Sequence, residues 1–79
     1  MTPAQLRMAR NALKLGVREL AEVANVTTAT ITRFENERGG LNAVTQEKLV
    51  GALETMGITF LNHGQSAIGA GVSLRLGRN

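Results

Sequence analysis

The chain has 79 residues, enough for one domain, but a domain of this size buries only about 60% of its surface, which argues against a deep catalytic cleft. Hydrophobic residues make up 43% and charged residues 19%, which is typical of a globular protein and excludes a disordered chain. The absence of cysteine excludes disulfides and thiolate metal sites. Nine basic against six acidic residues give a net charge of +3, which favours a polyanionic partner.

The beginning of the sequence indicates a cytoplasmic protein with no membrane partner. Residues 1–5 lack the basic and apolar segments of a signal peptide, and no apolar run approaches the roughly 20 residues that cross a bilayer. Because no disulfide is available, packing or dimerisation has to supply the stability of so small a chain.

The residue types argue against an enzyme. The chain has no cysteine nucleophile, no aspartate, no histidine–acid pair at a recognisable spacing and no cofactor fingerprint, so we expect no catalytic residue, cofactor or metal. His63 is the only histidine, and it stands beside Asn62 and Gly64 without partners for a metal. Residues 64–71 are rich in glycine but lack the GxxxxGK[ST] pattern of a phosphate loop, so a turn explains them better.

A first helix is predicted over residues 3–14. Thr2 as N-cap, Pro3 at the first helical position and Gln5 three residues after the cap form a capping box. The apolar residues recur at helical spacing on one face: Leu6, Ala9 and Leu13. The other faces carry three cations: Arg7, Arg10 and Lys14. These cations indicate either a solvated helix face or a stripe of phosphate contacts.

Two shorter helices follow. The second is predicted over residues 17–24, with Gly16 as its cap and Asn25 ending it, because asparagine tolerates the left-handed conformation of a helix end. Thr27 then caps a third helix, in which Ile31 and Phe34 face inward. The residues left facing outward are Thr28, Ala29, Thr32 and Arg33.

The last third of the sequence changes from helical to alternating character. A fourth helix begins at Asn42 or Thr45 and ends at Gly57. Its apolar residues are Val44, Leu49, Val50 and Leu53. Beyond it, apolar residues alternate as in half-buried strands: Ile58 and Phe60, then Val72, Leu74 and Leu76. This predicts a β-hairpin over residues 58–76 that packs on the helices or pairs with a second copy of the chain.

Residues 17–35 carry the most information about function. Two short helices joined by a turn that leaves no room for a linker are typical of a DNA-binding helix-turn-helix, whose second helix enters the major groove. Ala21 is small enough for the two helices to approach closely, and Asn25 suits the turn between them. The seam beneath is filled by Leu20, Ala24, Val26, Ile31 and Phe34.

The segment LAEVANVTTATITRFE, residues 20–35, resembles the Cro/phage-repressor (XRE-type) helix-turn-helix family. Its Leu-Ala pair, small turn residue, threonine cap and Ile before Phe-Glu are similar to the pattern of that family. The opening Met-Thr-Pro-Ala-Gln and the Gly-Ile-Thr-Phe after the fourth helix extend the resemblance over about residues 2–61. It implies a mainly α fold: a repressor-like helix-turn-helix domain of four helices over residues 2–57 and the β-hairpin, in a single domain of residues 1–79.

The resemblance also implies roles for individual residues. The face that reads bases consists of Thr28, Ala29, Thr32 and Arg33. Arg33 suits a bidentate contact to guanine, and Ala29 and the threonine methyl groups suit the thymine methyl. The residues suited to phosphates are Thr27, Arg38, Val17 and Arg18. Glu35 is expected to make a structural contact rather than to read a base.

A homodimeric transcriptional regulator is therefore expected, one that binds double-stranded operator DNA and acts mainly as a repressor. The expected dimerisation residues are Ile58, Phe60, Val72 and Leu74.

Arg33 has an alternative to base reading, which is pairing with Glu37 one helical turn later. A second interpretation of function stays open, because Arg33 is the one strong base contact on the third helix, and Gly16 and Val17 stand where the family often has Ser/Thr and Gln. On that interpretation the same fold binds a protein partner, as an antiactivator or an antitoxin does.

Overall fold

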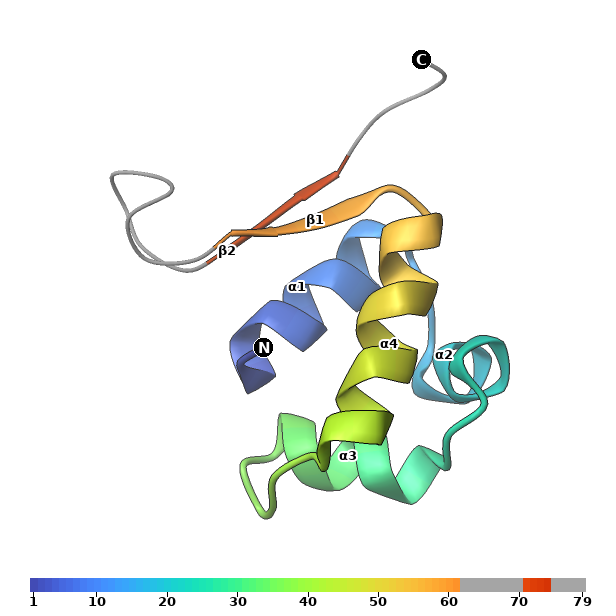
Figure 1. Ribbon diagram of the computed structural model, residues 1–79, viewed down its shortest axis with the longest axis vertical. Coiled ribbons are helices and arrows are strands. Elements are labelled where there is room, and N and C mark those ends of the chain that lie inside the picture. The colour runs from blue at the N-terminus through green and yellow to red at the C-terminus, as the bar shows by residue number, and fades with distance from the viewer. Residues whose placement is uncertain (62–70, 75–79) are drawn as a thin grey trace.

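The computed structural model describes residues 1–61 and 71–74, which form four helices followed by two paired strands (Figure 1). In chain order the elements are α1 (Pro3–Ala12), α2 (Val17–Ala24), α3 (Thr28–Glu35), α4 (Ala43–Thr55), β1 (Ile58–Leu61) and β2 (Gly71–Leu74). The expected mainly helical class with four helices is confirmed. The predicted positions His63, Gly64, Gly69 and Leu76 lie outside the described residues.

Side-chain oxygens begin three of the four helices. The Thr2 hydroxyl accepts a hydrogen bond from the Gln5 amide (3.1 Å), and the Gln5 side chain accepts one from the Thr2 amide (2.8 Å), so the predicted capping box is confirmed. Asn42, and not Thr45, caps α4, because its Oδ1 accepts from the Thr45 amide (2.7 Å). Thr27 caps α3 in the same way. These bonds satisfy amides that have no partner within the helix.

The first three helices end alike, with one residue in the left-handed region. These residues are Lys14 (φ 57°), Asn25 (φ 59°) and Glu37 (φ 59°). The next residue donates its N–H to a carbonyl five residues earlier: Leu15 to Arg10, Val26 to Ala21 and Arg38 to Arg33. This pattern closes a helix with a reversal of the chain. The predicted helix over residues 3–14 is therefore too long, because the turn at Lys14 ends α1 at Ala12.

One hydrophobic core joins all four helices and β1. Its buried residues are Leu6, Ala9, Leu20, Ala21, Ala24, Ile31, Phe34, Leu49, Leu53 and Ile58. Val44 was expected on the apolar side of the fourth helix, but its side chain is 61% exposed. Val44 lies five residues before Leu49, which places the two about 140° apart around a helix of 3.6 residues per turn. Leu49 and Leu53, one turn apart, hold the inward face instead.

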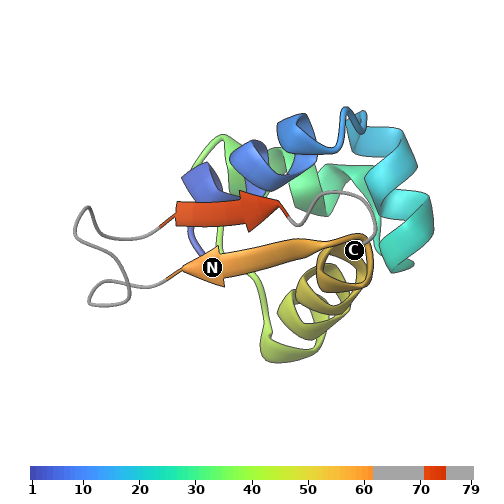
Figure 2. The same ribbon diagram turned by 90° about the horizontal axis from the view of Figure 1, so that it is seen from above.

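The two strands run antiparallel, with β2 beside α1 and β1 following the end of α4. Ile58 stands opposite Leu74, and Phe60 stands opposite Val72. Figure 2 shows β1 continuing from α4 and β2 lying on the side of α1, and α1 indeed contacts β2. The Ile58 side chain is only 2% exposed and belongs to the core, so β1 packs on the helices. The predicted hairpin over residues 58–76 includes residues 62–70 and 75–76, which lie outside the described residues.

Gly51 offers a direct test of how α4 is built. It lies in the interior of this helix on the exposed side, and a methyl group added to it meets no atom within 4 Å. Because alanine loses less conformational freedom than glycine in a helix, Gly51→Ala should raise the free energy of unfolding by about 1 kcal/mol. Urea unfolding of the two proteins measures this difference. An unchanged or lower stability would mean that α4 is not helical through residue 51.

Candidate nucleic-acid interface

α3 divides its residues sharply between the core and solvent. Ile31 (0% exposed) and Phe34 (7%) are buried, and so is the side chain of Glu35. The four residues predicted to read bases are all exposed: Thr28, Ala29, Thr32 and Arg33. The expected inward and outward faces of this helix are therefore confirmed. The outward face is a surface of small residues that ends in one long cation, and we call these four residues the α3 face.

The turn between α2 and α3 is short and held from three sides. Asn25 takes the left-handed conformation (φ 59°, ψ 49°) that was expected of it, and Val26 donates to the Ala21 carbonyl (3.0 Å). Lys48 of α4 reaches the Asn25 carbonyl with its ammonium group (3.4 Å). Ala21 and Ala24 are both 5% exposed, so the two helices approach each other over small side chains. The orientation of α3 against α2 is thus fixed by backbone bonds and by close packing.

The beginning of α3 is capped by threonines. The Thr27 hydroxyl accepts from the Thr30 amide (3.2 Å) and lies 2.8 Å from the Thr30 hydroxyl. The capping role of Thr27 is confirmed, and its contact to a phosphate stays a prediction. The amides of Thr28 and Ala29 lie in the first turn, where a helix has no acceptors of its own for them.

The beginning of α2 is built differently. Gly16 is its N-cap, as predicted, and offers no side-chain bond; instead the Glu19 carboxylate accepts from the Gly16 amide (2.7 Å). Val17 is half-buried and Arg18 is exposed. The amides of these two residues belong to the first turn and point along the axis out of the helix. A phosphate bound there would lie near the Glu19 carboxylate, which weakens this anchor relative to one capped by a neutral hydroxyl.

Arg33 and Arg38 supply the positive charge near the C-terminal end of α3. Both are exposed, and the Arg38 amide donates to the Arg33 carbonyl (2.8 Å). The alternative pairing of Arg33 with Glu37 is not formed, because no hydrogen bond or ion pair joins them in the described part of the chain. Glu37 takes the left-handed conformation, which carries it out of the helical register on which an i,i+4 pair depends.

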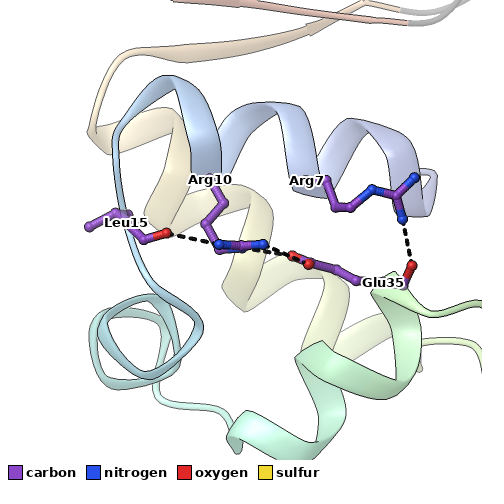
Figure 3. A network of polar contacts seen from close by, with 4 residues as sticks. All are labelled: Arg7, Arg10, Leu15 and Glu35. Carbon is purple, nitrogen blue, oxygen red and sulfur yellow. Dashed lines mark hydrogen bonds and ion pairs between the residues drawn. The ribbon is translucent and has the colours of Figure 1, made fainter.

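A polar network ties the end of α3 to α1 (Figure 3). Arg10 donates through Nε and Nη2 to the two Glu35 carboxylate oxygens, both at 2.9 Å, and through Nη1 to the Leu15 carbonyl (3.1 Å). Arg7 donates to the Glu35 carbonyl. Arg10 is therefore neither part of a solvated face nor free to bind phosphate, because all three nitrogens of its guanidinium donate hydrogen bonds within the protein. Sequence reasoning anticipated a structural role for Glu35 but not its partners.

The Arg10–Glu35 pair lies at the edge of the core. The Arg10 side chain is 18% exposed and that of Glu35 is 7% exposed. The hydrogen bonds that Arg10 donates to the Glu35 carboxylate raise the pKa of Arg10 above its ordinary value, more than burial lowers it. Since the folded chain holds this proton more tightly, the stabilisation is complete below the ordinary arginine pKa and is lost only as the pH rises through the higher folded value. Arg10 thus stays charged throughout the neutral range.

Removing Glu35 should destabilise the protein strongly. Glu35→Ala leaves the Arg10 guanidinium largely buried without its carboxylate, a change that costs about 3 kcal/mol in buried pairs. Replacing both residues at once, as Arg10→Met with Glu35→Leu, should recover most of this loss because no charge is then stranded. Urea unfolding of the single and double variants measures the difference. A single variant within about 0.5 kcal/mol of the wild type would contradict a structural role for the pair.

The four residues predicted to form a dimer stand together in the strand pair. Phe60 is half-buried against the core, and its cross-strand neighbour is Val72. Ile58 stands opposite Leu74, and its side chain is used within the chain. The groups of β1 that remain available for contact with a second copy of the chain are its backbone edge and the exposed Thr59. Dimerisation through these strands stays a prediction.

No family model matches this chain, and no curated protein matches it either. The described helices include none with the length and apolar character needed to traverse a bilayer. Within residues 1–61 and 71–74, no three histidine or acidic side chains gather closely enough to hold a metal ion. The proposal for function therefore depends on the geometry of α2, the turn and α3.

Proposed function

We propose that this protein is a transcriptional regulator that binds double-stranded DNA sequence-specifically, through a helix-turn-helix of the Cro/phage-repressor (XRE-type) kind. The observation that carries the proposal is the division of α3: one side is fixed in the core by Ile31, Phe34 and Glu35, and the opposite side is wholly exposed. A short helix held in this way after a tight turn has the form that enters the major groove. The described fold and the net charge of +3 both fit such a partner.

The chemistry of the α3 face suits base edges. Arg33 carries the planar donor fork that binds the O6 and N7 atoms of guanine, and Ala29 and the Thr32 methyl group suit the thymine methyl. Ala29 and Arg33 are four residues apart, which is about 6 Å along a helix and corresponds to about two base pairs. We therefore infer a half-site in which a thymine and a guanine stand about two positions apart.

Phosphate contacts would flank this face on both sides. The free amides at the start of α3, next to the Thr27 cap, form one anchor, and the exposed Arg38 in the loop after α3 forms another. Val17 and Arg18, at the start of α2, would provide a third, weaker anchor because Glu19 lies beside them. These contacts set the position of the helix in the groove and carry no sequence information.

One α3 face reads only a few base pairs, so we propose that two copies bind a palindromic operator. Two-fold related recognition helices meet half-sites about 34 Å apart, which is one turn of DNA. The paired strands β1 and β2, with residues Ile58, Phe60, Val72 and Leu74, are the proposed dimer element. A dimer bound at a promoter would block RNA polymerase there, which would make the protein a repressor. Its own promoter is the first candidate target.

Fluorescence anisotropy of the purified protein with its own upstream DNA and with a scrambled duplex tests this function. We expect tighter binding to the upstream duplex, with affinity falling steeply as salt rises, because phosphate contacts release counterions. Arg33→Ala should reduce the preference by about tenfold, the value of one lost bidentate contact. Sedimentation of the complex should find two chains per duplex.

Arg33→Lys is the matched control, because it retains the charge but not the bidentate fork. If Arg33 reads guanine, Arg33→Lys loses the preference as Arg33→Ala does and keeps the salt dependence of the wild type. If Arg33→Lys binds as the wild type does, Arg33 contacts phosphate only. Equal binding of the wild type to both duplexes would contradict sequence-specific regulation.

A protein partner is the second candidate function, and two observations favour it. Val23 of α2 is 56% exposed and Val44 of α4 is 61% exposed, so each presents an apolar side chain that a protein partner would cover. The Glu19 carboxylate also occupies the start of α2. As an antiactivator or antitoxin, the protein would associate through apolar contacts, and its affinity would change little with salt.

A further inference from the structure

The loop after α3 contains a glycine whose missing side chain makes room for Arg33. A Cβ atom built on Gly39 would lie 2.8 Å from Nε of Arg33, 3.0 Å from its Cδ and 3.2 Å from its Cγ. The first of these distances is below 3.0 Å, a separation that real Cβ atoms essentially never show, and the other two are tighter than nine in ten real Cβ contacts. The Arg33 side chain therefore lies along the Gly39 backbone over three consecutive atoms, in a space that only glycine leaves free.

The neighbouring glycine has no such role. A Cβ atom on Gly40 meets nothing within 4 Å. Neither Gly39 nor Gly40 has a positive φ, since Gly57 alone among the described glycines does, so both backbones accept an L-residue without strain. The chain thus offers two adjacent glycines that differ in one respect, the contact with Arg33.

We propose that Gly39 is a specificity-determining position: its bare backbone is the surface on which the Arg33 side chain rests, and this orients the guanidinium for reading a guanine. The inference rests on the proposed function, because it assigns a cause to the placement of the base-reading cation. Gly39 itself contacts no base and acts through Arg33.

Two properties of arginine make such a support effective. Its side chain has many rotamers, and a bidentate contact requires the planar fork to lie in one orientation, so a side chain that is already placed loses less freedom on binding. In addition, no described side chain holds Arg33 by a hydrogen bond or ion pair. The close approach to the Gly39 backbone is therefore the restraint that we assign to this side chain before DNA arrives.

The test compares Gly39→Ala with Gly40→Ala in the full chain. The readout is the ratio of the affinities for the upstream duplex and the scrambled duplex at one salt concentration. We expect Gly39→Ala to lower this ratio by about five- to tenfold, approaching Arg33→Ala, and Gly40→Ala to leave it unchanged. In a chain that already carries Arg33→Ala, Gly39→Ala should have no further effect.

Two measurements on the free protein accompany the binding series. The NMR signal of the Arg33 Nε–H group should move in Gly39→Ala and stay in place in Gly40→Ala. The thermal midpoints of the two variants should agree, because the displaced atoms belong to an exposed side chain that is able to move. If Gly39→Ala also lowers the midpoint, adding Arg33→Ala should restore it, since the added methyl group then meets no side chain.

The outcomes separate this inference from the proposed function. If the wild type does not distinguish the two duplexes, both fail. Suppose that the wild type distinguishes the two duplexes and Arg33→Ala does not. If Gly39→Ala then distinguishes them as well as the wild type does, only the inference is overturned. It is overturned equally if Gly39→Ala weakens the preference as much without Arg33 as with it, because Gly39 would then act by another route.

Discussion

Arg10 and Glu35 form the ion pair on which the placement of α3 depends. A helix of eight residues is too short to be stable on its own in water, so α3 needs external support at both ends. The Thr27 cap holds its beginning, and the Glu35 pair with Arg10, together with the Arg7 bond to the Glu35 carbonyl, fastens its end to α1. Arg10 also bonds the Leu15 carbonyl, so one guanidinium joins α1, the α1–α2 turn and α3.

The residues of α3 that stabilise the fold and the residues that are available for binding lie on opposite sides of the helix. Every residue of α3 that stabilises the fold lies on the inner side, where Ile31, Phe34 and Glu35 are buried. The α3 face takes no part in the core, so changes there alter what is bound with little effect on folding. Such a separation is what a recognition helix requires, because its outer residues have to match a sequence while its position stays constant. Under the proposed function, Gly39 would place the Arg33 side chain of this face from the following loop, without contacting a base itself.

Much of this fold could be predicted from local sequence signals. The capping box at Thr2, the bounds of α2, the left-handed Asn25 and the two faces of α3 all follow from residue types at short spacing. The end of α1 could not be read in the same way, because Lys14 is a residue type that gives no signal of the left-handed conformation it adopts.

The polar network was missed because it joins residues 25 apart in the chain. One signal was present: Glu35 is four residues after the inward Ile31, so helical periodicity already places this carboxylate on the buried side, where it needs a cation. Whether the strands also join two copies depends on contacts between chains, which a pattern within one chain does not specify.

The central claim is that the α3 face, and not another surface, meets the DNA. A titration of the isotope-labelled protein with its upstream duplex, followed by amide NMR shifts, tests this most directly. The account predicts that the largest shifts fall on residues 27–33 and on Arg38 and Gly39, with smaller ones at the start of α2. Shifts centred on Val23, Val44 or α1, with the α3 face unaffected, would contradict it.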